Sequence, residues 1–282
     1  MPELPEVETI KMGLEKYLVG HKVEKVEVRL KKILTGGKEL LVGGEITGVR
    51  RFAKVLCLDL NNGYSALIHL KMTGQPIYRG PNLKTPTRLS EKVVGGLPGI
   101  HTHVIFHLDR GGNFYFNDFR RFGWIKIVKT QELKEDSFVG KLGPEPLRDL
   151  TEEIFNNILS KTKKSIKVLL MDQTKIGGVG NIYANDALFL AGIHPKRAAN
   201  SLDQREMLKL FKSVEKVLKD GIKYGGASEH AYVTSEGLEG RYQEHFLVYD
   251  RAGLPCPNSC GEKIQKTNLG GRGTYFCPKC QK

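Results

Sequence analysis

Four cysteines close to the end of the chain have the spacing of a metal site. Cys256 and Cys260 form one pair, Cys277 and Cys280 form the second, and sixteen residues separate the pairs. Four thiolates at this spacing can surround a tetrahedral Zn²⁺, and four ligands close the coordination shell, so the metal would be structural. An iron site or four unrelated thiols are the alternatives. Cys57 stands alone in KVLCLDL, which predicts a small buried apolar side chain.

The first residues, MPELPEVET, place two prolines and two glutamates in the first turns of a predicted helix. One explanation is structural, because Pro is tolerated at a helix start and acidic side chains there complement the helix dipole. The other explanation is chemical, with Met1 removed so that Pro2 becomes the N-terminus. The opening residues alone leave both explanations open.

Residues suited to contacts with nucleic acid occur at four further places. NDFRRFGW sets Arg120 between two aromatics after a predicted strand, which fits a surface corner or a wedge that enters a base stack. Met72 in HLKMTG is a second candidate wedge, although a single Met at a strand end is more often core.

Asn181 opens a helix after the turn IGGVG, where exposed amides bind phosphate well, although most such turns are only turns. Lys54 lies in the predicted strand RRFAKVL, facing either solvent or a cleft where neighbouring cations lower its pKa.

The composition points to a polyanionic partner. Lys and Arg number 44 and Asp and Glu number 31 among 282 residues, which gives a net charge of +13. Nucleic acid is the default partner for this excess, and a thermophilic or merely basic protein is the alternative. The sequence has no apolar run long enough to cross a membrane and no signal peptide, so we expect a cytoplasmic protein.

The elements that must position these residues change from strands to helices along the chain. Residues 1–18 have the apolar period of a helix. Short β-rich segments with tight turns follow as far as residue 129, which predicts an antiparallel sandwich or barrel. Residues 80–99 are rich in Pro and Gly, and residues 227–241 have no strong period, so both stretches are expected as loops. Helices are expected at residues 152–161, 166–171, 181–192 and 203–224.

Several motifs resemble the bacterial formamidopyrimidine-DNA glycosylase family, which repairs 8-oxoguanine in DNA. They are MPELPEVET, HLKMTG, RRFG, LGPEPL, GVGNIYA, AGIHP and GRGTYFCPKCQK, and they occur in the family's order from Met1 to Lys282. The related endonuclease VIII type usually has Gly where Leu4 stands, so Leu4 favours the branch that acts on purine lesions. The resemblance implies an α+β multidomain fold. Its expected domains are a helix and antiparallel β-sandwich at 1–133, a helix-two-turn-helix domain with a lesion-capping loop at 134–246, and a zinc-finger β-hairpin at 247–282.

The resemblance also implies an activity, that of a monomeric DNA glycosylase and abasic-site lyase with one structural Zn²⁺. Such an enzyme removes oxidised purines from damaged double-stranded DNA. The Pro2 amine attacks C1′, since an α-amino group with a pKa of about 8 is partly neutral at pH 7. The resulting iminium ion allows β- and δ-elimination. Glu3 opens the sugar and moves protons, Glu6 supports it, Lys54 acts as an acid and phosphate contact, and Arg272 donates a proton in δ-elimination.

The same resemblance implies a set of DNA contacts. Phe122 joins Met72 and Arg120 in filling the gap left by a flipped nucleotide, and residues 226–241 cover the flipped base. Two departures from the family pattern are Phe119, where Pro is usual, and a C-x₃-C first knuckle; they put the aim of Arg120 and the hairpin register around Arg272 in doubt. A non-catalytic zinc protein that binds DNA and an enzyme of the endonuclease VIII type are the alternatives. The implied contacts are His69, Met72, His101, Arg120, Phe122, Lys163, Lys167 and Asn181.

Overall fold

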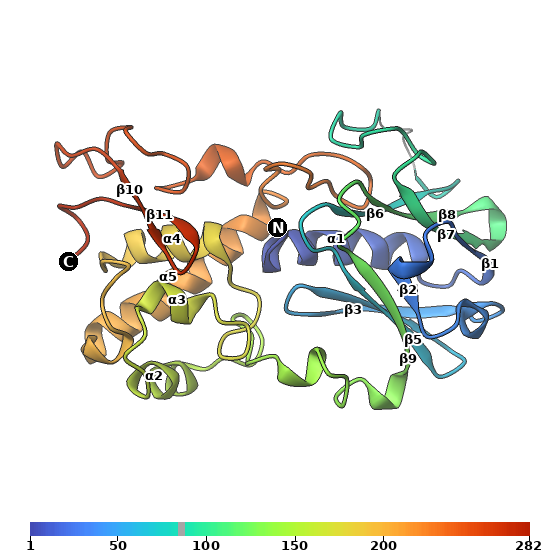
Figure 1. Cartoon of the computed structure of the whole chain (residues 1–282), viewed down its shortest axis with the longest axis horizontal. Coiled ribbons are helices and arrows are strands. Elements are labelled where there is room, and N and C mark those ends of the chain that lie inside the picture. The colour runs from blue at the N-terminus through green and yellow to red at the C-terminus, as the bar shows by residue number, and fades with distance from the viewer. Residues whose placement is uncertain (84–87) are drawn as a thin grey trace. The chain divides into compact units, whose positions relative to one another are not determined.

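The chain divides into two compact units in a computed structural model that describes residues 1–83 and 88–282 (Figure 1). Met1–Gly140 and Ile222–Gln243 form the first unit, and Lys141–Gly221 and Glu244–Lys282 form the second. The segment expected to cap the lesion therefore belongs with the β-rich unit, whereas the expected domain boundaries place it with the helices. The zinc-finger region shares a unit with the helices.

The first unit begins with α1 (Leu4–Leu18), which starts three residues later than the sequence predicts. Glu3 has an extended backbone, and its amide donates a hydrogen bond of 2.7 Å to the Glu6 carboxylate, which defines the start of the helix. The predicted apolar face is confirmed, because residues spaced three and four apart are fully buried on one side. These residues are Val7, Ile10, Leu14 and Leu18.

The first unit contains two β-sheets, and all their strand pairs are antiparallel except β2 with β9. One apolar core contains side chains from both sheets and from α1, so the predicted sandwich is confirmed. Cys57 is fully buried in this unit, as its apolar neighbours predict. The four-stranded sheet has the order β1 (Val23–Val28), β7 (Thr102–Leu108), β8 (Asn113–Asp118) and β6 (Gly74–Arg79). The five-stranded sheet has the order β2 (Leu34–Thr35), β9 (Trp124–Lys129), β5 (Tyr64–His69), β4 (Val55–Leu60) and β3 (Ile46–Phe52).

The second unit consists of helices and one β-hairpin. Thr151 caps the first helix by accepting a hydrogen bond from the Ile154 amide at 3.2 Å, and Gly192 ends the third with a φ of 77°. In the described residues, 1–83 and 88–282, no helix has the length and apolar character needed to span a membrane. The helices are α2 (Glu152–Ser160), α3 (Ile166–Leu170), α4 (Asn181–Ala191) and α5 (Gln204–Lys223), whose last two residues belong to the first unit, and the hairpin strands are β10 (Gln265–Leu269) and β11 (Arg272–Phe276).

Candidate active site and nucleic-acid interface

The start of α1 gathers a buried proline and two buried carboxylates. Pro2 is buried, and Glu3 and Glu6 are 3% and 1% exposed. Glu6 accepts the Glu3 amide on one oxygen at 2.7 Å and the Ala227 amide on the other at 2.8 Å. A single carboxylate thus fixes the N-terminal turn and the beginning of the loop at 226–241.

The N-terminal amine of the full chain has a lowered pKa. Burial is the largest cause, because it disfavours the ammonium form, and the charge of Lys54 acts in the same direction. The carboxylates of Glu3, Glu6 and Glu229 oppose this effect and raise the pKa. An amine in this position therefore keeps its lone pair at a lower pH than an exposed amine would. Glu229 was not predicted as a site residue, because the sequence shows only an acidic side chain within a long loop.

Lys54 lies in the turn between β3 and β4, so its predicted place within a strand is wrong. Ala53 has a φ of 51°, and this left-handed residue reverses the chain. Arg51 supports the turn by donating to the Ala53 carbonyl at 3.0 Å and to the Glu8 carboxylate of α1 at 2.6 Å. Lys54 itself is 5% exposed. Arg51 therefore ties the turn that carries Lys54 to the helix that carries the two buried glutamates.

Asp118, at the end of β8, organises the turn that follows it. Its side chain is 1% exposed and accepts hydrogen bonds from the amides of Arg120 and Gly123 at 3.2 and 2.7 Å. It also accepts the hydroxyl of Thr73, which in turn accepts the Arg120 amide at 3.3 Å. One buried carboxylate therefore connects the turn at 118–123 to the segment that contains Met72.

The expected wedge residues are carried by these two connected segments. Phe122 is 56% exposed, and the Arg120 guanidinium lies 5.1 Å from the centre of its ring. Met72 is half-buried beside Thr73. Phe119, which replaces the usual Pro, is exposed and lies edge-on to His101 with the ring centres 6.3 Å apart. The turn thus presents an aromatic and a cationic side chain to solvent.

The two histidines expected to contact DNA differ in their surroundings. His69 packs against Trp124 and Phe138, and its Nδ1 accepts the Lys71 amide at 2.9 Å. Burial, with smaller contributions from nearby lysine charges, lowers the pKa of His69 to about 3, so the ring is neutral near pH 7. His101 is half-buried, and its Nδ1 has no hydrogen-bond partner among the described residues. The two rings therefore differ, because His69 is held by an aromatic cluster and a backbone amide, whereas the Nδ1 of His101 is buried without a hydrogen-bond partner among the described residues.

Lys167 requires a correction. The sequence places this residue among the phosphate contacts, but its exposed fraction is 0%. Its ammonium donates to the Gly273 carbonyl at 3.0 Å and to the Thr274 hydroxyl at 2.7 Å. Both partners belong to β11, which begins at Arg272. Lys167 therefore attaches the hairpin to α3 and does not face a polyanion.

The remaining basic and amide contacts expected in the second unit are accessible. Asn181 is the first residue of α4 and is half-buried, whereas Lys163 and Arg272 are exposed. Gln173 holds the glycine-rich turn before α4 by accepting the Gly178 amide at 3.0 Å and donating to the Val179 carbonyl at 2.7 Å. The predicted helix start at Asn181 is confirmed.

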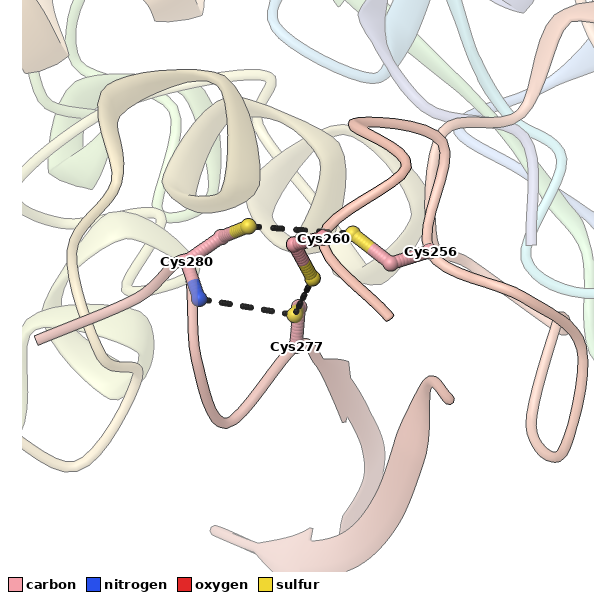
Figure 2. Close-up of side chains that lie close together, drawn as sticks. All are labelled: Cys256, Cys260, Cys277 and Cys280. Carbon is pink, nitrogen blue, oxygen red and sulfur yellow. Dashed lines mark hydrogen bonds between the residues drawn. The ribbon is translucent and has the colours of Figure 1, made fainter. Parts of the chain in front are cut away.

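The four terminal cysteines converge on one point (Figure 2). All four sulfur atoms lie within 4.8 Å of one another, with Cys256 and Cys280 3.7 Å apart and Cys260 and Cys277 3.5 Å apart. Tetrahedral Zn–S bonds of about 2.3 Å require sulfur separations of about 3.8 Å, so the donor set fits zinc. The protein has one structural zinc site, and four thiolates leave no position on the metal for a reacting group.

Two neighbouring side chains of α4 hold the zinc region in place, although no local pattern in the sequence marks either of them. Asn185 accepts the Tyr275 amide of β11 at 2.8 Å. Asp186 is fully buried and accepts the amides of three successive residues before the first knuckle. These are Leu247 at 3.1 Å, Val248 at 3.0 Å and Tyr249 at 3.1 Å.

Comparisons with known proteins agree with this arrangement along the whole chain. Residues 1–125 match the formamidopyrimidine-DNA glycosylase N-terminal domain, residues 142–232 its H2TH domain, and residues 253–282 the zinc finger found in FPG and IleRS. The fold and site therefore define a DNA-repair glycosylase. Formamidopyrimidine-DNA glycosylases from Pelotomaculum thermopropionicum and Listeria innocua are 41% and 38% identical, and the alignments cover 100% of this chain and 99% and 100% of theirs. The chain belongs to the formamidopyrimidine-DNA glycosylase family, a family of glycosylase and abasic-site lyase enzymes.

Solved structures of Lactococcus lactis Fpg share the same fold. A complex with DNA containing an abasic site is 34% identical, with a TM-score of 0.85 and coverage of 99% of both chains. A complex of a mutant enzyme with DNA containing Fapy-dG is 34% identical, with a TM-score of 0.87 and full coverage of both chains. The expected α+β class with a zinc hairpin is confirmed.

Proposed function

We propose that this enzyme removes oxidised purines, 8-oxoguanine and formamidopyrimidines, from duplex DNA and then cuts the strand at the abasic site. The observation that carries the proposal is the cluster at the start of α1, where buried Pro2 lies beside buried Glu3 and Glu6 and the charges of Glu3, Glu6 and Lys54 act on the N-terminal amine of the full chain. A protein that only bound DNA would not need these groups. The complexes of the Lactococcus lactis relatives with Fapy-dG and abasic-site DNA support the same substrate class. We further propose that it acts as a monomer in the bacterial cytoplasm.

The reaction begins once Met1 is removed and Pro2 carries the N-terminal amine. The neutral amine attacks C1′ of the damaged nucleotide, and the base leaves with the bonding electrons and a proton. Glu3 moves protons as the sugar ring opens, and Glu6 keeps the helix start in position. The product is an iminium ion, which withdraws electrons from C2′ and acidifies its protons.

Strand cleavage follows from this acidity. Loss of a C2′ proton expels the 3′ phosphate in β-elimination, and a second proton loss expels the 5′ phosphate in δ-elimination. Lys54 acts as an acid and a phosphate contact, and Arg272 supplies a proton in the second step. Water then hydrolyses the iminium ion and regenerates the free amine.

The DNA must be held with the damaged nucleotide turned out of the helix, because C1′ is screened by stacked bases. Met72, Arg120 and Phe122 fill the vacated space, and residues 226–241 cover the extruded base. The remaining contacts position the backbone, and the charge of +13 supports affinity for DNA. They are His69, His101, Lys163 and Asn181.

Borohydride trapping tests the proposal directly, because the reagent reduces an iminium ion to a stable covalent bond. Protein of verified mass, lacking Met1, is mixed with duplex DNA containing 8-oxoguanine paired with cytosine. We expect a covalent complex with the wild type and much less with Pro2→Gly, which keeps an amine but changes its basicity and geometry. A protein that binds this duplex without forming a complex would be a non-catalytic binder. Faster release of thymine glycol than of 8-oxoguanine would indicate the endonuclease VIII type.

A further inference from the structure

The loop at residues 226–241 is docked on the rest of the first unit. Ala231, Tyr232 and Val233 are all less than 5% exposed, and Val233 packs with Ile77 and Val93. The loop also pairs by backbone, because the Tyr78 amide donates to the Ser235 carbonyl at 2.8 Å and the Ser90 amide to the Gly237 carbonyl at 2.9 Å. These contacts come from β6 and from the segment at 88–97, which we call the bracing segment.

Lys92, in the bracing segment, contacts both ends of the loop. Its ammonium donates to the Ser228 carbonyl at 2.6 Å and to the Glu239 carboxylate at 2.5 Å. The Ser90 hydroxyl donates to the other oxygen of Glu239 at 2.6 Å. The two ends are also joined directly, because the Ser228 hydroxyl accepts the Gly240 amide at 2.8 Å. The ammonium of Lys92 therefore closes the base of the loop.

The contacts of Lys92 are partly protected from water. The side chain of Lys92 is 26% exposed and that of Glu239 is 42% exposed. The hydrogen bond from Lys92, followed by that from Ser90, holds the pKa of Glu239 below its usual value. Gln75 on β6 adds a second connection, since its amide donates to the Ala231 carbonyl at 2.7 Å and to the Lys92 carbonyl at 2.8 Å. Hydrogen bonds donated by Lys92 and by Gln75 therefore connect the loop to the bracing segment.

The base of the loop is continuous with the reacting end of α1. Ala227 precedes Ser228 and donates its amide to Glu6, and Glu229 follows Ser228 and raises the pKa of the N-terminal amine. A displacement of Ser228 moves both neighbours relative to the amine. The Lys92 ammonium holds Ser228 through its carbonyl, so it acts on this end of the loop through Ser228.

We propose that Lys92 is a positioning residue that holds the loop at 226–241 closed over the damaged base. The proposal rests on the proposed function, in which this loop covers the extruded base. Lys92 acts through Ser228 and Glu239 and contributes to specificity, because an abasic site offers no base for the loop to cover. Its removal therefore affects base excision more than cleavage of an abasic site.

The kinetic test uses Lys92→Met, which keeps the length of the side chain and removes the charge. Under single-turnover conditions we expect the excision rate for 8-oxoguanine paired with cytosine to fall about tenfold, and cleavage of an abasic site to change less than about twofold. Lys92→Arg retains a cationic donor and should restore most of the excision rate. Lys129→Met is the matched control, because Lys129 forms an ion pair of 3.0 Å with Glu132 away from the loop. Equal losses on both substrates would overturn the proposal.

Hydrogen exchange tests the positioning without relying on activity. In Lys92→Met, the amides of residues 227–240 should exchange faster while those of the sheets keep their protection. Combining Lys92→Glu with Glu239→Lys should recover both protection and excision relative to either single variant. Unchanged exchange in Lys92→Met would contradict the proposal. A wild type that releases no base would instead refute the proposed function, and the exchange experiment would still test how the loop is held.

Discussion

The turn that carries Arg120 and the hairpin that carries Arg272 present the same kind of side chain with different means of support. The first follows β8 in a unit with an apolar core drawn from two sheets and α1, and one buried carboxylate, Asp118, is enough to shape it. The second belongs to a two-stranded hairpin with a small apolar cluster. It depends on zinc and on the buried side chains of Lys167 and Asn185.

The difference shows how core size determines the support that an exposed functional residue needs. A two-stranded hairpin is marginally stable in water, and a bound metal replaces the core that it lacks. A turn between strands of a large sandwich is stabilised by the apolar core beneath those strands, so local hydrogen bonds are enough to shape it. Arg272 should therefore depend on the metal, and Arg120 on the presence of a single side chain, that of Asp118.

The largest expected effect is that of breaking the zinc site. Structural zinc contributes on the order of 10 kcal/mol to folding of small domains, so Cys277→Ser should disorder the hairpin and misplace Arg272. We expect a large loss of affinity for lesion-bearing DNA while residues 1–130 remain folded. Metal content, DNA titration and hydrogen exchange across both units measure these effects. Normal binding and cleavage by a metal-free variant would contradict the contrast between the two arginines.

The second effect is that of removing Asp118. Asp118→Ala removes the acceptor of the buried Thr73 hydroxyl and of the Gly123 amide, and one of the two acceptors of the Arg120 amide, which should lower the free energy of unfolding by about 3 kcal/mol. Asp118→Asn keeps an acceptor oxygen and should lose less. Denaturant unfolding of the first unit measures the change. Full stability in Asp118→Ala would mean that the backbone alone shapes the turn.

The third effect concerns the wedge. Phe122 is mostly exposed, so Phe122→Ala should leave stability nearly unchanged. Unstacking a base costs a few kcal/mol, and the variant should slow excision of 8-oxoguanine far more than cleavage of a ready-made abasic site. Single-turnover rates on the two duplexes measure the difference. Equal losses would leave Phe122 as a packing residue.

A smaller effect separates the two lysines of the second unit. Exposed Lys163 is proposed to contact phosphate, so Lys163→Met should reduce the slope of log affinity against log salt by about 1. Buried Lys167 is bonded to β11, so Lys167→Met should lower the stability of the hairpin and leave that slope unchanged. DNA titrations from low to moderate salt distinguish the two. A reduced slope in Lys167→Met would restore it as a phosphate contact.

The smallest effect is a shift in pH dependence within the first unit. Glu229 raises the pKa of the N-terminal amine in the full chain, and its charge should act in the same direction on the Pro2 amine once Met1 is removed. Glu229→Gln should therefore lower the pKa of the reacting amine and move the acidic limb of excision to lower pH. The sign follows because removal of a negative charge disfavours the ammonium form. Single-turnover rates across the acidic limb measure the shift. A limb that moves to higher pH would show that Glu229 acts in another way.

The sequence by itself determined the features that depend on neighbours close in the chain. Cysteine spacing predicted the zinc site, because ligands of a tetrahedral metal come from two short knuckles. The apolar period predicted the buried face of α1, and Thr151 and Gly192 marked helix ends through local hydrogen bonds and a local φ. The resemblance of seven short motifs predicted the family, which the comparisons confirm.

The tertiary structure decided everything that depends on contacts across long stretches of chain. Lys54 sits in a turn because Ala53 adopts a left-handed φ, a conformation that its residue type does not indicate. Lys167 is buried because its acceptors lie 106 and 107 residues away. Lys92 reaches the loop at 226–241 across 136 and 147 residues. A lysine has the same local pattern whether its ammonium is solvated or paired, and only the folded chain brings the distant acceptor that decides between the two.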